Sequence, residues 1–272
     1  MKRISIMLAA LFALTLNINA LRNFELPLWE GNDLTDDAAD ARIYVYLADN
    51  PTGQAVIACP GGAYVGLAMD NEGNWFAPLF NQAGISTIVL KYRLPKQRPD
   101  IPLKDAEQAM RIVRNHAKEW NIDPNNVGIM GGSAGGHLAS TLATHYSSKD
   151  TRPDFQILLY PVTSLDEKYQ PSSQIIIKNL IGPNKPDEVE KYNNVKHVNK
   201  DTPTAFIVLS AEDTIVPIEN SLLYAQALID NGVQVSLHMY PGGFHGFGCW
   251  DEFKDAAIWK KELIRWMKKY YK

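Results

Sequence analysis

The chain has 272 residues, of which 46% are hydrophobic and 10% aromatic, and its formal net charge is −3. A chain of this length buries roughly three-quarters of the surface that it exposes when unfolded, so it needs neither a disulfide framework nor a metal to fold. The composition excludes disorder, collagen and a coiled coil, and the slightly acidic balance argues against nucleic acid as a partner. We therefore expect one large globular domain.

The first twenty residues differ from the rest of the chain. Two basic residues precede an almost continuously apolar stretch from Ile4 to Leu16, and Ala20 supplies a small residue at a cleavage point. This pattern predicts a secretory signal peptide over residues 1–20. A transmembrane anchor is the alternative, but about 13 apolar residues are too few to span a bilayer comfortably. We expect cleavage near Ala20, no stable membrane insertion and a secreted or periplasmic domain over residues 21–272.

Short apolar runs alternate with longer amphipathic runs along the rest of the chain. The short runs predict strands over Ile43–Leu47, Ala55–Cys59, Ile85–Lys91, Val127–Met130, Phe155–Tyr160, Ala205–Ser210 and Val235–Tyr240. Continuously apolar runs suit parallel strands that are buried on both faces. Apolar spacings of three and four residues predict helices within 103–120 and 253–270. The alternation predicts an α/β fold with a doubly wound, mostly parallel sheet and helices on both faces, a three-layer sandwich.

One segment, residues 163–201, breaks this alternation. It contains several prolines around a short apolar stretch at 175–181. A linker between domains is one interpretation, but a strand pattern continues after it, which favours a cap-like excursion within a single domain. Such an excursion usually lies above the carboxyl ends of the strands, where ligands bind.

A Gly-x-Ser-x-Gly motif occupies residues 131–135, between a predicted strand and a predicted helix. A tight turn of this kind exposes the hydroxyl of Ser133, and glycines beside it avoid clashes with the strand and the helix. The start of the helix also favours developing negative charge. The motif alone is weak, since a glycine-rich turn can simply pack a helix on a strand. Its position between the two elements predicts that Ser133 is a nucleophile.

A nucleophilic serine needs a general base and a group that orients the base. Glu212 and Asp213 follow one predicted strand, and His245 follows the next. The order serine, acid, histidine is that of α/β-hydrolases and differs from the order in chymotrypsin-type and subtilisin-type enzymes. Among the other histidines, His116 and His145 are expected on helix surfaces, His238 in a strand, and His137 on the helix after Ser133 with local hydrogen bonds.

The segment Cys59-Pro60-Gly61-Gly62-Ala63-Tyr64 follows another predicted strand. Esterases of the α/β-hydrolase fold use such a loop to direct backbone N–H groups at an oxyanion, together with the N–H after the nucleophile. The candidate oxyanion-hole donors are the N–H groups of Gly62, Ala63 and Ala134. An ordinary turn is the alternative for the two glycines.

The chain has two cysteines, Cys59 and Cys249, and both lie next to these segments. Export permits a disulfide, but its geometry cannot be read from sequence, so pairing and two separate thiols both stay open. Ligand spacings such as His-Glu-x-x-His or Cys-x-x-Cys do not occur in the sequence, so a catalytic metal has no support in it. The serine chemistry expected here requires no cofactor.

Five blocks occur in a characteristic order: Pro60–Tyr64, Val89–Leu94, Gly131–Ala139, Asp213–Pro217 and His245–Phe247. Together they resemble the α/β-hydrolase esterases of the acetyl xylan esterase and bacterial feruloyl-esterase-like group. The resemblance implies the α/β-hydrolase fold, with Ser133 as nucleophile, His245 as base and Asp213, rather than Glu212, as the acid. Two positions depart from the pattern. Ala63 stands where a third glycine is frequent, and Cys59-Pro60 replaces the His-Gly start of the hormone-sensitive-lipase-like branch.

The resemblance and the predicted export together imply a serine esterase that acts on a small-molecule or polysaccharide ester through an acyl-enzyme, with acetyl groups on xylan or xylo-oligosaccharides as the first substrate. Tyr64, Trp75 and Trp250 flank the expected site and are candidates for stacking on sugar rings, with buried packing as the alternative for each. A feruloyl or other short-chain carboxylesterase, a serine peptidase of the prolyl-oligopeptidase type and a non-catalytic binding protein are the other interpretations. The acyl group, the sugar and the oligomeric state stay open.

Overall fold

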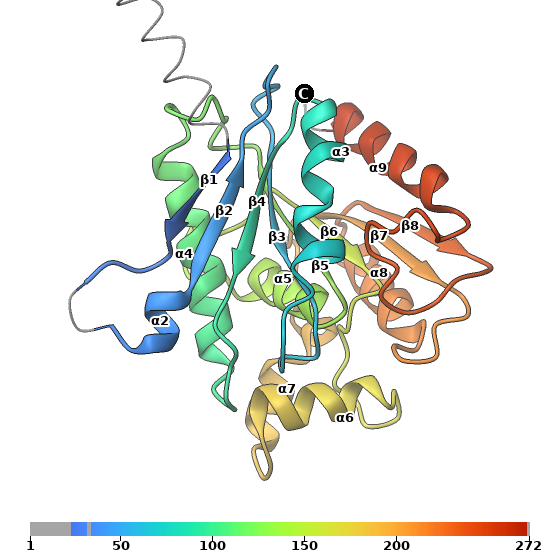
Figure 1. Ribbon diagram of the computed structural model, residues 1–272. Helices are drawn as coiled ribbons and strands as arrows, with labels where there is room; N and C mark the ends of the chain where they lie inside the picture. Colours follow the sequence, from blue (N-terminus) through green and yellow to red (C-terminus); the bar gives the residue numbers. More distant parts are fainter. Residues whose placement is uncertain (1–22, 32–33, 271–272) are drawn as a thin grey trace, which may run out of the picture.

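Eight strands form one sheet in the computed structural model of the protein, which describes residues 23–31 and 34–270. The strand order is β1-β2-β4-β3-β5-β6-β7-β8 (Figure 1). The strands are β1 (Asn23–Pro27), β2 (Arg42–Tyr46), β3 (Ala55–Cys59), β4 (Ser86–Lys91), β5 (Val127–Gly132), β6 (Phe155–Leu159), β7 (Thr204–Ser210) and β8 (Val235–Tyr240). β2 is antiparallel to β1 and β4, and the other neighbours are parallel. The predicted signal peptide over residues 1–20 lies outside the described residues.

The sequence predicts β2 to β8 to within two residues and misses β1. β1 is a five-residue edge strand whose side chains alternate between exposed and half-buried, so its sequence lacks a continuous apolar run. The mostly parallel α/β sheet with helices on both faces is confirmed.

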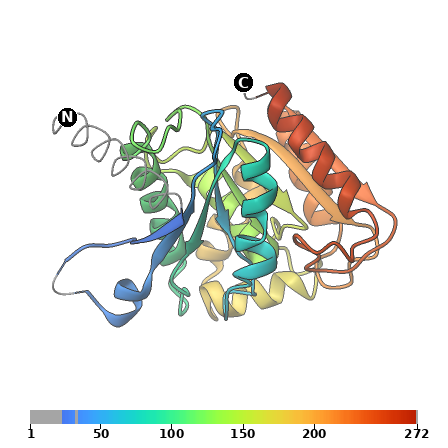
Figure 2. The ribbon, with the colours of Figure 1, turned by 45° about the horizontal axis from the view of Figure 1, so that its top comes forward.

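Helices cover both faces of this sheet (Figure 2). They are α3 (Phe76–Gln82), α4 (Asp100–Asn115), α5 (Ser133–His145), α8 (Glu219–Asp230) and α9 (Ala256–Tyr270), whereas the short helix α2 (Asp36–Asp40) lies beyond one end of β2 in Figure 1. Two groups of buried side chains assign the long helices to faces: α4, α5 and α8 pack on one face, and α3 and α9 pack on the other. Within the described residues, no helix has both the length and the apolar character needed to cross a bilayer.

β3 illustrates why its sequence is apolar at every position. Neighbouring side chains of a strand point to opposite faces of a sheet. Accordingly, Ala55, Ile57 and Cys59 join the group beneath α4 and α5, whereas Val56 and Ala58 join the group beneath α3 and α9. All five residues are buried, as expected for a parallel strand between two helical layers.

Residues 163–201, here called the cap segment, connect β6 to β7. They form α6 (Ser172–Ile176), the π-helical turn η2 (Ile177–Ile181), α7 (Pro186–Lys191) and the 3₁₀ turn η3 (Asn194–His197). α6 and α7 lie beyond one end of the sheet in Figure 1. Asn194 fixes the segment to α5, because its Nδ2 donates to the carbonyl of His137 at 3.0 Å and to the hydroxyls of Ser140 and Thr141 at 2.8 and 2.9 Å.

His137 forms a second, fully buried link between α5 and the cap segment. Its Nε2 lies 2.9 Å from the carbonyl oxygen of Tyr192, and its Nδ1 lies 2.9 Å from the hydroxyl of Tyr64. A carbonyl oxygen only accepts hydrogen bonds, so Nε2 carries the proton and Nδ1 accepts from Tyr64. Burial disfavours the charged imidazolium and lowers the pKa of His137 to about 4.

We expect this histidine to make the folded protein sensitive to acid. Below pH 6.5 the unfolded chain protonates His137 while the folded chain does not, so stability falls as the pH drops from 6.5 to about 4. The full contribution is about 3 kcal/mol of unfolding free energy. Urea titrations at several pH values test this. His137→Gln should show a shallower pH dependence in this window, and an unchanged dependence would contradict the assignment.

Candidate active site

Ser133 stands at the junction of β5 and α5, where the backbone turns sharply. Its φ angle is 53°, a left-handed conformation that is unusual for a residue with a side chain. The turn fits only because glycines surround it: a Cβ atom on Gly131 would lie 2.1 Å from the carbonyl oxygen of Gly135, and one on Gly135 would lie 2.0 Å from that of Cys59. The glycines of the motif therefore allow the strand, the helix and the neighbouring loop to meet at Ser133.

The structure brings Ser133, His245 and Asp213 together. The Oγ of Ser133 lies 2.8 Å from Nε2 of His245, and Nδ1 of His245 lies 2.7 Å from Oδ2 of Asp213. Since an ionised carboxylate only accepts, Nδ1 donates to Asp213, and Nε2 is left to accept the serine proton. This is the hydrogen-bond pattern of a nucleophile, a base and an orienting acid.

The acid is held in place by its own loop. Oδ1 of Asp213 accepts hydrogen bonds from the N–H groups of Ile215 and Val216, each at 2.9 Å, and its side chain is only 1% exposed. Glu212, the neighbouring carboxylate, is exposed. The structure therefore decides between the two acids: Asp213 contacts His245.

The loop after β3 presents unpaired N–H groups beside Ser133. Two of its carbonyl groups are engaged in the loop itself: that of Gly61 accepts from the Ala68 N–H at 2.9 Å, and that of Gly62 accepts from the N–H groups of Val65 and Gly66. In a trans peptide the N–H points opposite to the carbonyl. The N–H groups of Gly62 and Ala63 consequently face away from these contacts, and both residues line the cavity that contains Ser133.

The Ala134 N–H, the third predicted donor, lies in the first turn of α5. The first N–H groups of a helix have no acceptor within that helix. Within the described residues, no hydrogen bond occupies the N–H groups of Gly62, Ala63 or Ala134. All three are therefore free to bind an anionic oxygen next to Ser133.

Tyr64 does not lie where the sequence analysis expected it. It is 3% exposed, packs edge-to-face on Tyr92 and His137, and donates its hydroxyl to His137. A side chain so deeply buried has almost no surface to offer a sugar, so we correct its role from substrate contact to anchor of the loop. The backbone at Ala63 and Tyr64 is in the strained left-handed conformation, with φ angles of 55° and 58°. Such a conformation persists only where the surrounding structure holds it, and the buried Tyr64 side chain provides these contacts.

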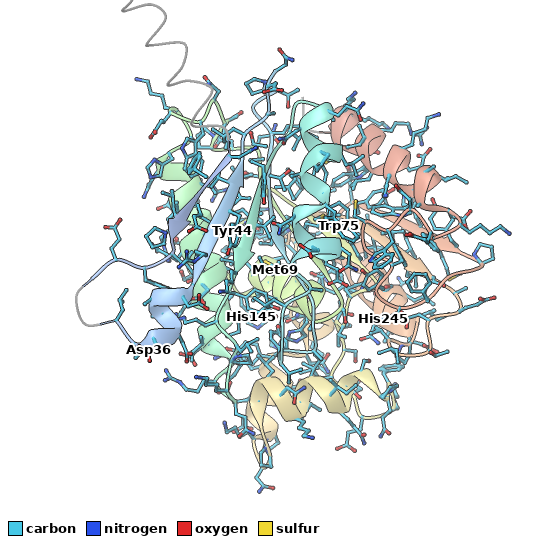
Figure 3. All side chains as sticks on the ribbon, viewed as in Figure 1. Asp36, Tyr44, Met69, Trp75, His145 and His245 are labelled. Carbon is cyan, nitrogen blue, oxygen red and sulfur yellow. The ribbon has the colours of Figure 1, made fainter. Side chains whose placement is uncertain are left out.

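Trp250 and Trp75 lie at the surface and contact each other. They are 38% and 46% exposed, and their ring centroids are 5.5 Å apart. The segments that carry them lie side by side, because the Asn71 side chain donates to the Gly246 carbonyl at 3.0 Å and the Asn71 carbonyl accepts the Cys249 N–H at 2.7 Å. Trp75 and His245 are labelled in Figure 3. The two tryptophans thus form an exposed aromatic pair, and each lies four residues along the chain from a residue that lines the cavity, Asn71 or Gly246.

A cavity of about 310 Å³ opens at Ser133 and His245. The cap segment supplies part of its wall, and the lining is mainly small or apolar: Gly62, Ala63, Ala68, Val162, Ile175, Ile176, Ile215 and Val216. A larger cleft of about 1080 Å³ lies elsewhere and is lined by charged side chains. Its Arg114 is bonded to three backbone carbonyls and to Asp154, which indicates a structural role for this arginine.

A buried carboxylate, Glu72, lies beside the site and was not predicted. It is 4% exposed and its Oε2 accepts the Gly61 N–H at 2.6 Å, while its Oε1 accepts the Tyr160 hydroxyl at 2.8 Å. Burial raises the pKa of Glu72, and these two hydrogen bonds oppose the rise. No motif marks this residue, because only the folded chain brings residues 61, 72 and 160 together.

Both cysteines are unbridged. Cys59 is buried in β3, and the Sγ of Cys249 lies 3.3 Å from the carbonyl oxygen of Trp75. The structure therefore favours the interpretation of two separate thiols.

Known proteins with similar sequences include two bacterial proteins. An acetylxylan esterase of Xylanibacter ruminicola is 38% identical over 265 residues, which are 95% of this chain and 53% of that protein. Endo-1,4-beta-xylanase B of Butyrivibrio fibrisolvens is 32% identical over 249 residues, which are 83% of this chain and 38% of that protein. The chain thus spans about half the length, or less, of these relatives.

A similar solved structure is that of an acetyl ester-xyloside bifunctional hydrolase from Caldicellulosiruptor lactoaceticus. It has a TM-score of 0.82 and 37% identity, over 91% of this chain and 96% of that one. A family model described as alpha/beta hydrolase fold matches residues 56–248, a range that includes Ser133, Asp213 and His245. The family model covers most of the chain and the sheet has the expected mostly parallel topology, so the chain belongs to the alpha/beta hydrolase fold family.

Proposed function

We propose that the protein is a serine esterase that removes acetyl groups from xylan or xylo-oligosaccharides. The observation that carries the proposal is the hydrogen-bonded triad of Ser133, His245 and Asp213 at the mouth of a small apolar cavity. The names of the related acetylxylan esterase and acetyl ester-xyloside hydrolase support the substrate. A volume of about 310 Å³ is at the low end for small-molecule sites, which suits a short acyl group.

The geometry supports a two-step reaction. His245 Nε2 takes the proton of Ser133 as Oγ attacks the ester carbonyl, and Asp213 stabilises the imidazolium that forms. The N–H groups of Gly62, Ala63 and Ala134 bind the negative oxygen of the tetrahedral intermediate. His245 then protonates the leaving sugar oxygen. Water activated by the same histidine hydrolyses the acyl-enzyme and releases acetate, so the steps need no cofactor.

The test measures release of acetate from acetylated xylan, with 4-nitrophenyl acetate and a feruloylated sugar in parallel. Deacetylation of xylan supports the proposal. Hydrolysis of 4-nitrophenyl acetate alone would keep the esterase and overturn the xylan assignment, and preference for the feruloylated sugar would identify a feruloyl esterase. Absence of activity on every ester would favour a peptidase or a non-catalytic binding protein.

We also propose that the protein acts after export, in the periplasm or outside the cell. The basic and apolar pattern of residues 1–20 supports this. The mass of the protein recovered from the producing cells tests it, because cleavage near Ala20 removes about 20 residues.

The exposed pair of Trp75 and Trp250 allows a second test, which compares a substrate that contains several sugar units with one that contains none. We propose that Trp250 stacks on a sugar unit next to the acetylated one. Covering about 50 Å² of apolar surface is worth about 1.2 kcal/mol, so Trp250→Ala should lower kcat/KM for acetylated xylo-oligosaccharides about eightfold. Activity on 4-nitrophenyl acetate, which has no sugar, should stay within about twofold.

A matched control is Tyr270→Ala, which removes another exposed aromatic side chain, at the end of α9. It should leave kcat/KM for both substrates unchanged. Equal losses on both substrates in Trp250→Ala would show that the residue supports the site generally and does not bind sugar.

A further inference from the structure

We propose that Glu72 is a positioning residue for catalysis, which holds the oxyanion loop (residues 60–64) and the histidine loop (residues 244–249) in one arrangement. This inference rests on the esterase function proposed above. Glu72 lies in the π-helical turn η1 (Asp70–Asn74), outside the triad and the oxyanion donors. Three sets of contacts and its burial without an ion pair support its role.

The first contact fixes one peptide plane of the oxyanion loop. The carbonyl of Pro60 and the N–H of Gly61 belong to the same peptide unit. The Tyr92 hydroxyl donates to this carbonyl at 2.7 Å, and the N–H donates to Glu72 at 2.6 Å, so the plane is held at both ends. The following peptide carries the Gly62 N–H, a proposed oxyanion donor. By fixing the Pro60–Gly61 peptide, Glu72 helps to set the orientation of the next peptide, and so the direction of the Gly62 N–H.

The second contact extends to the histidine loop. The Tyr160 hydroxyl donates to Glu72 at 2.8 Å and accepts the N–H of Gly248 at 2.8 Å. The Tyr160 ring also packs edge-on against the imidazole of His245, with the centroids 5.0 Å apart. Tyr160 therefore connects Glu72 both to the backbone near His245 and to the imidazole itself.

The third contact is with the turn that carries the nucleophile. A Cβ atom on Gly132 would lie 2.8 Å from the Cδ of Glu72, so the carboxylate rests directly against the residue before Ser133. A single carboxylate therefore touches the oxyanion loop and the nucleophile turn, and reaches the histidine loop through one tyrosine. These are the three segments whose relative positions decide whether the serine, the base and the oxyanion donors act together.

The fourth observation is that Glu72 is buried without an ion pair. No salt bridge to Glu72 occurs among the described residues, whereas the buried Asp105 pairs with Arg93 at 2.6 Å. A buried carboxylate without a cation lowers folding stability. Such a placement is typical of a group kept for function, and it predicts that removal of the charge affects activity more than stability.

Glu72→Gln tests the inference, because it keeps the size of the side chain but leaves one of its two donors without an acceptor. We expect kcat for 4-nitrophenyl acetate to fall about 10- to 100-fold, less than the 100- to 1,000-fold typical of losing an oxyanion donor. KM should change less than about threefold, since the acyl cavity is intact. The midpoint of thermal unfolding should stay within about 3 °C of wild type.

Glu107 is a control with similar burial and similar hydrogen-bond donors, although it also pairs with Arg111 at 3.5 Å. It is also a buried glutamate, and its Oε1 accepts one backbone N–H, from Ser147 at 2.7 Å, and one hydroxyl, from Thr151 at 3.3 Å. Both partners follow the carboxyl end of α5, a helix about 20 Å long, whereas Ser133 starts it. Glu107→Gln should therefore leave kcat unchanged.

Tyr160→Phe gives a second variant that keeps the ring against His245 and removes only the hydroxyl. It should lower kcat less than Glu72→Gln, and the double variant should lose less than the product of the two single effects, because both act through one network. A kcat within twofold of wild type in both single variants would overturn the inference while leaving the esterase intact. An inactive wild-type protein would instead overturn the proposed function, and the inference with it.

Discussion

Replacing Ser133 by alanine is expected to lower kcat for 4-nitrophenyl acetate by about 10⁴- to 10⁶-fold, as removal of a catalytic serine does in other triad enzymes. The expectation follows from the 2.8 Å hydrogen bond between Ser133 and His245, through which the histidine takes the proton of the nucleophile. Alanine keeps the Cβ atom, so the strained turn and its packing are unchanged. The loss should therefore appear in kcat without a comparable change in stability.

Ser172→Ala is the matched control for this prediction. Ser172 lines the same cavity, but its hydroxyl donates to the Tyr169 carbonyl at 3.1 Å and makes no hydrogen bond with His245. The control should stay within about threefold of wild type. A fluorophosphonate probe adds a measurement independent of turnover: the wild type should gain the mass of one probe, and Ser133→Ala none. Probe attachment at another serine would show that the nucleophile is assigned wrongly.

The sequence predicted the sheet well because its strands are marked by burial on both faces. β3 and β6 are continuously buried, and their apolar runs coincide with the strands themselves. β1 was not predicted, because an edge strand with alternating exposure has no continuous apolar run. Prolines set residues 163–201 apart in the sequence, but the division of this segment into four short helical pieces depends on contacts such as those of Asn194 with α5, which no local pattern encodes.

The residues of the site were predictable to different degrees for a related reason. Ser133, Asp213 and His245 each follow a strand, and parallel strands bring their carboxyl ends to one edge of the sheet, so position in the pattern implied proximity. Tyr64 was assigned to substrate binding because the sequence of a glycine-rich loop does not reveal whether an aromatic side chain in it faces solvent or the core. Glu72 was missed because its role depends on contacts with residues 61 and 160, far apart in sequence.

Replacing Asp213 by asparagine is expected to lower kcat by about 10³- to 10⁴-fold, close to what the equivalent change does in a serine protease. The amide oxygen can still accept the N–H groups of Ile215 and Val216, so the loop keeps its shape. The amide nitrogen then donates to Nδ1 of His245, which must accept. The proton moves to Nε2, and His245 can no longer take the proton of Ser133. Measurement of kcat and KM on 4-nitrophenyl acetate tests this.

Glu212→Gln makes the same chemical change one residue away, on an exposed side chain. It should leave kcat within about twofold, because surface substitutions of this kind have small effects. Comparison of Asp213→Asn with Glu212→Gln separates two effects on kcat: the orientation of His245 by a hydrogen bond, and the negative charge of the loop. If the two carboxylates acted only through their field, both variants would lower kcat to a similar extent. Only the hydrogen bond of 2.7 Å between Asp213 and His245 predicts that one variant is nearly inactive and the other nearly normal.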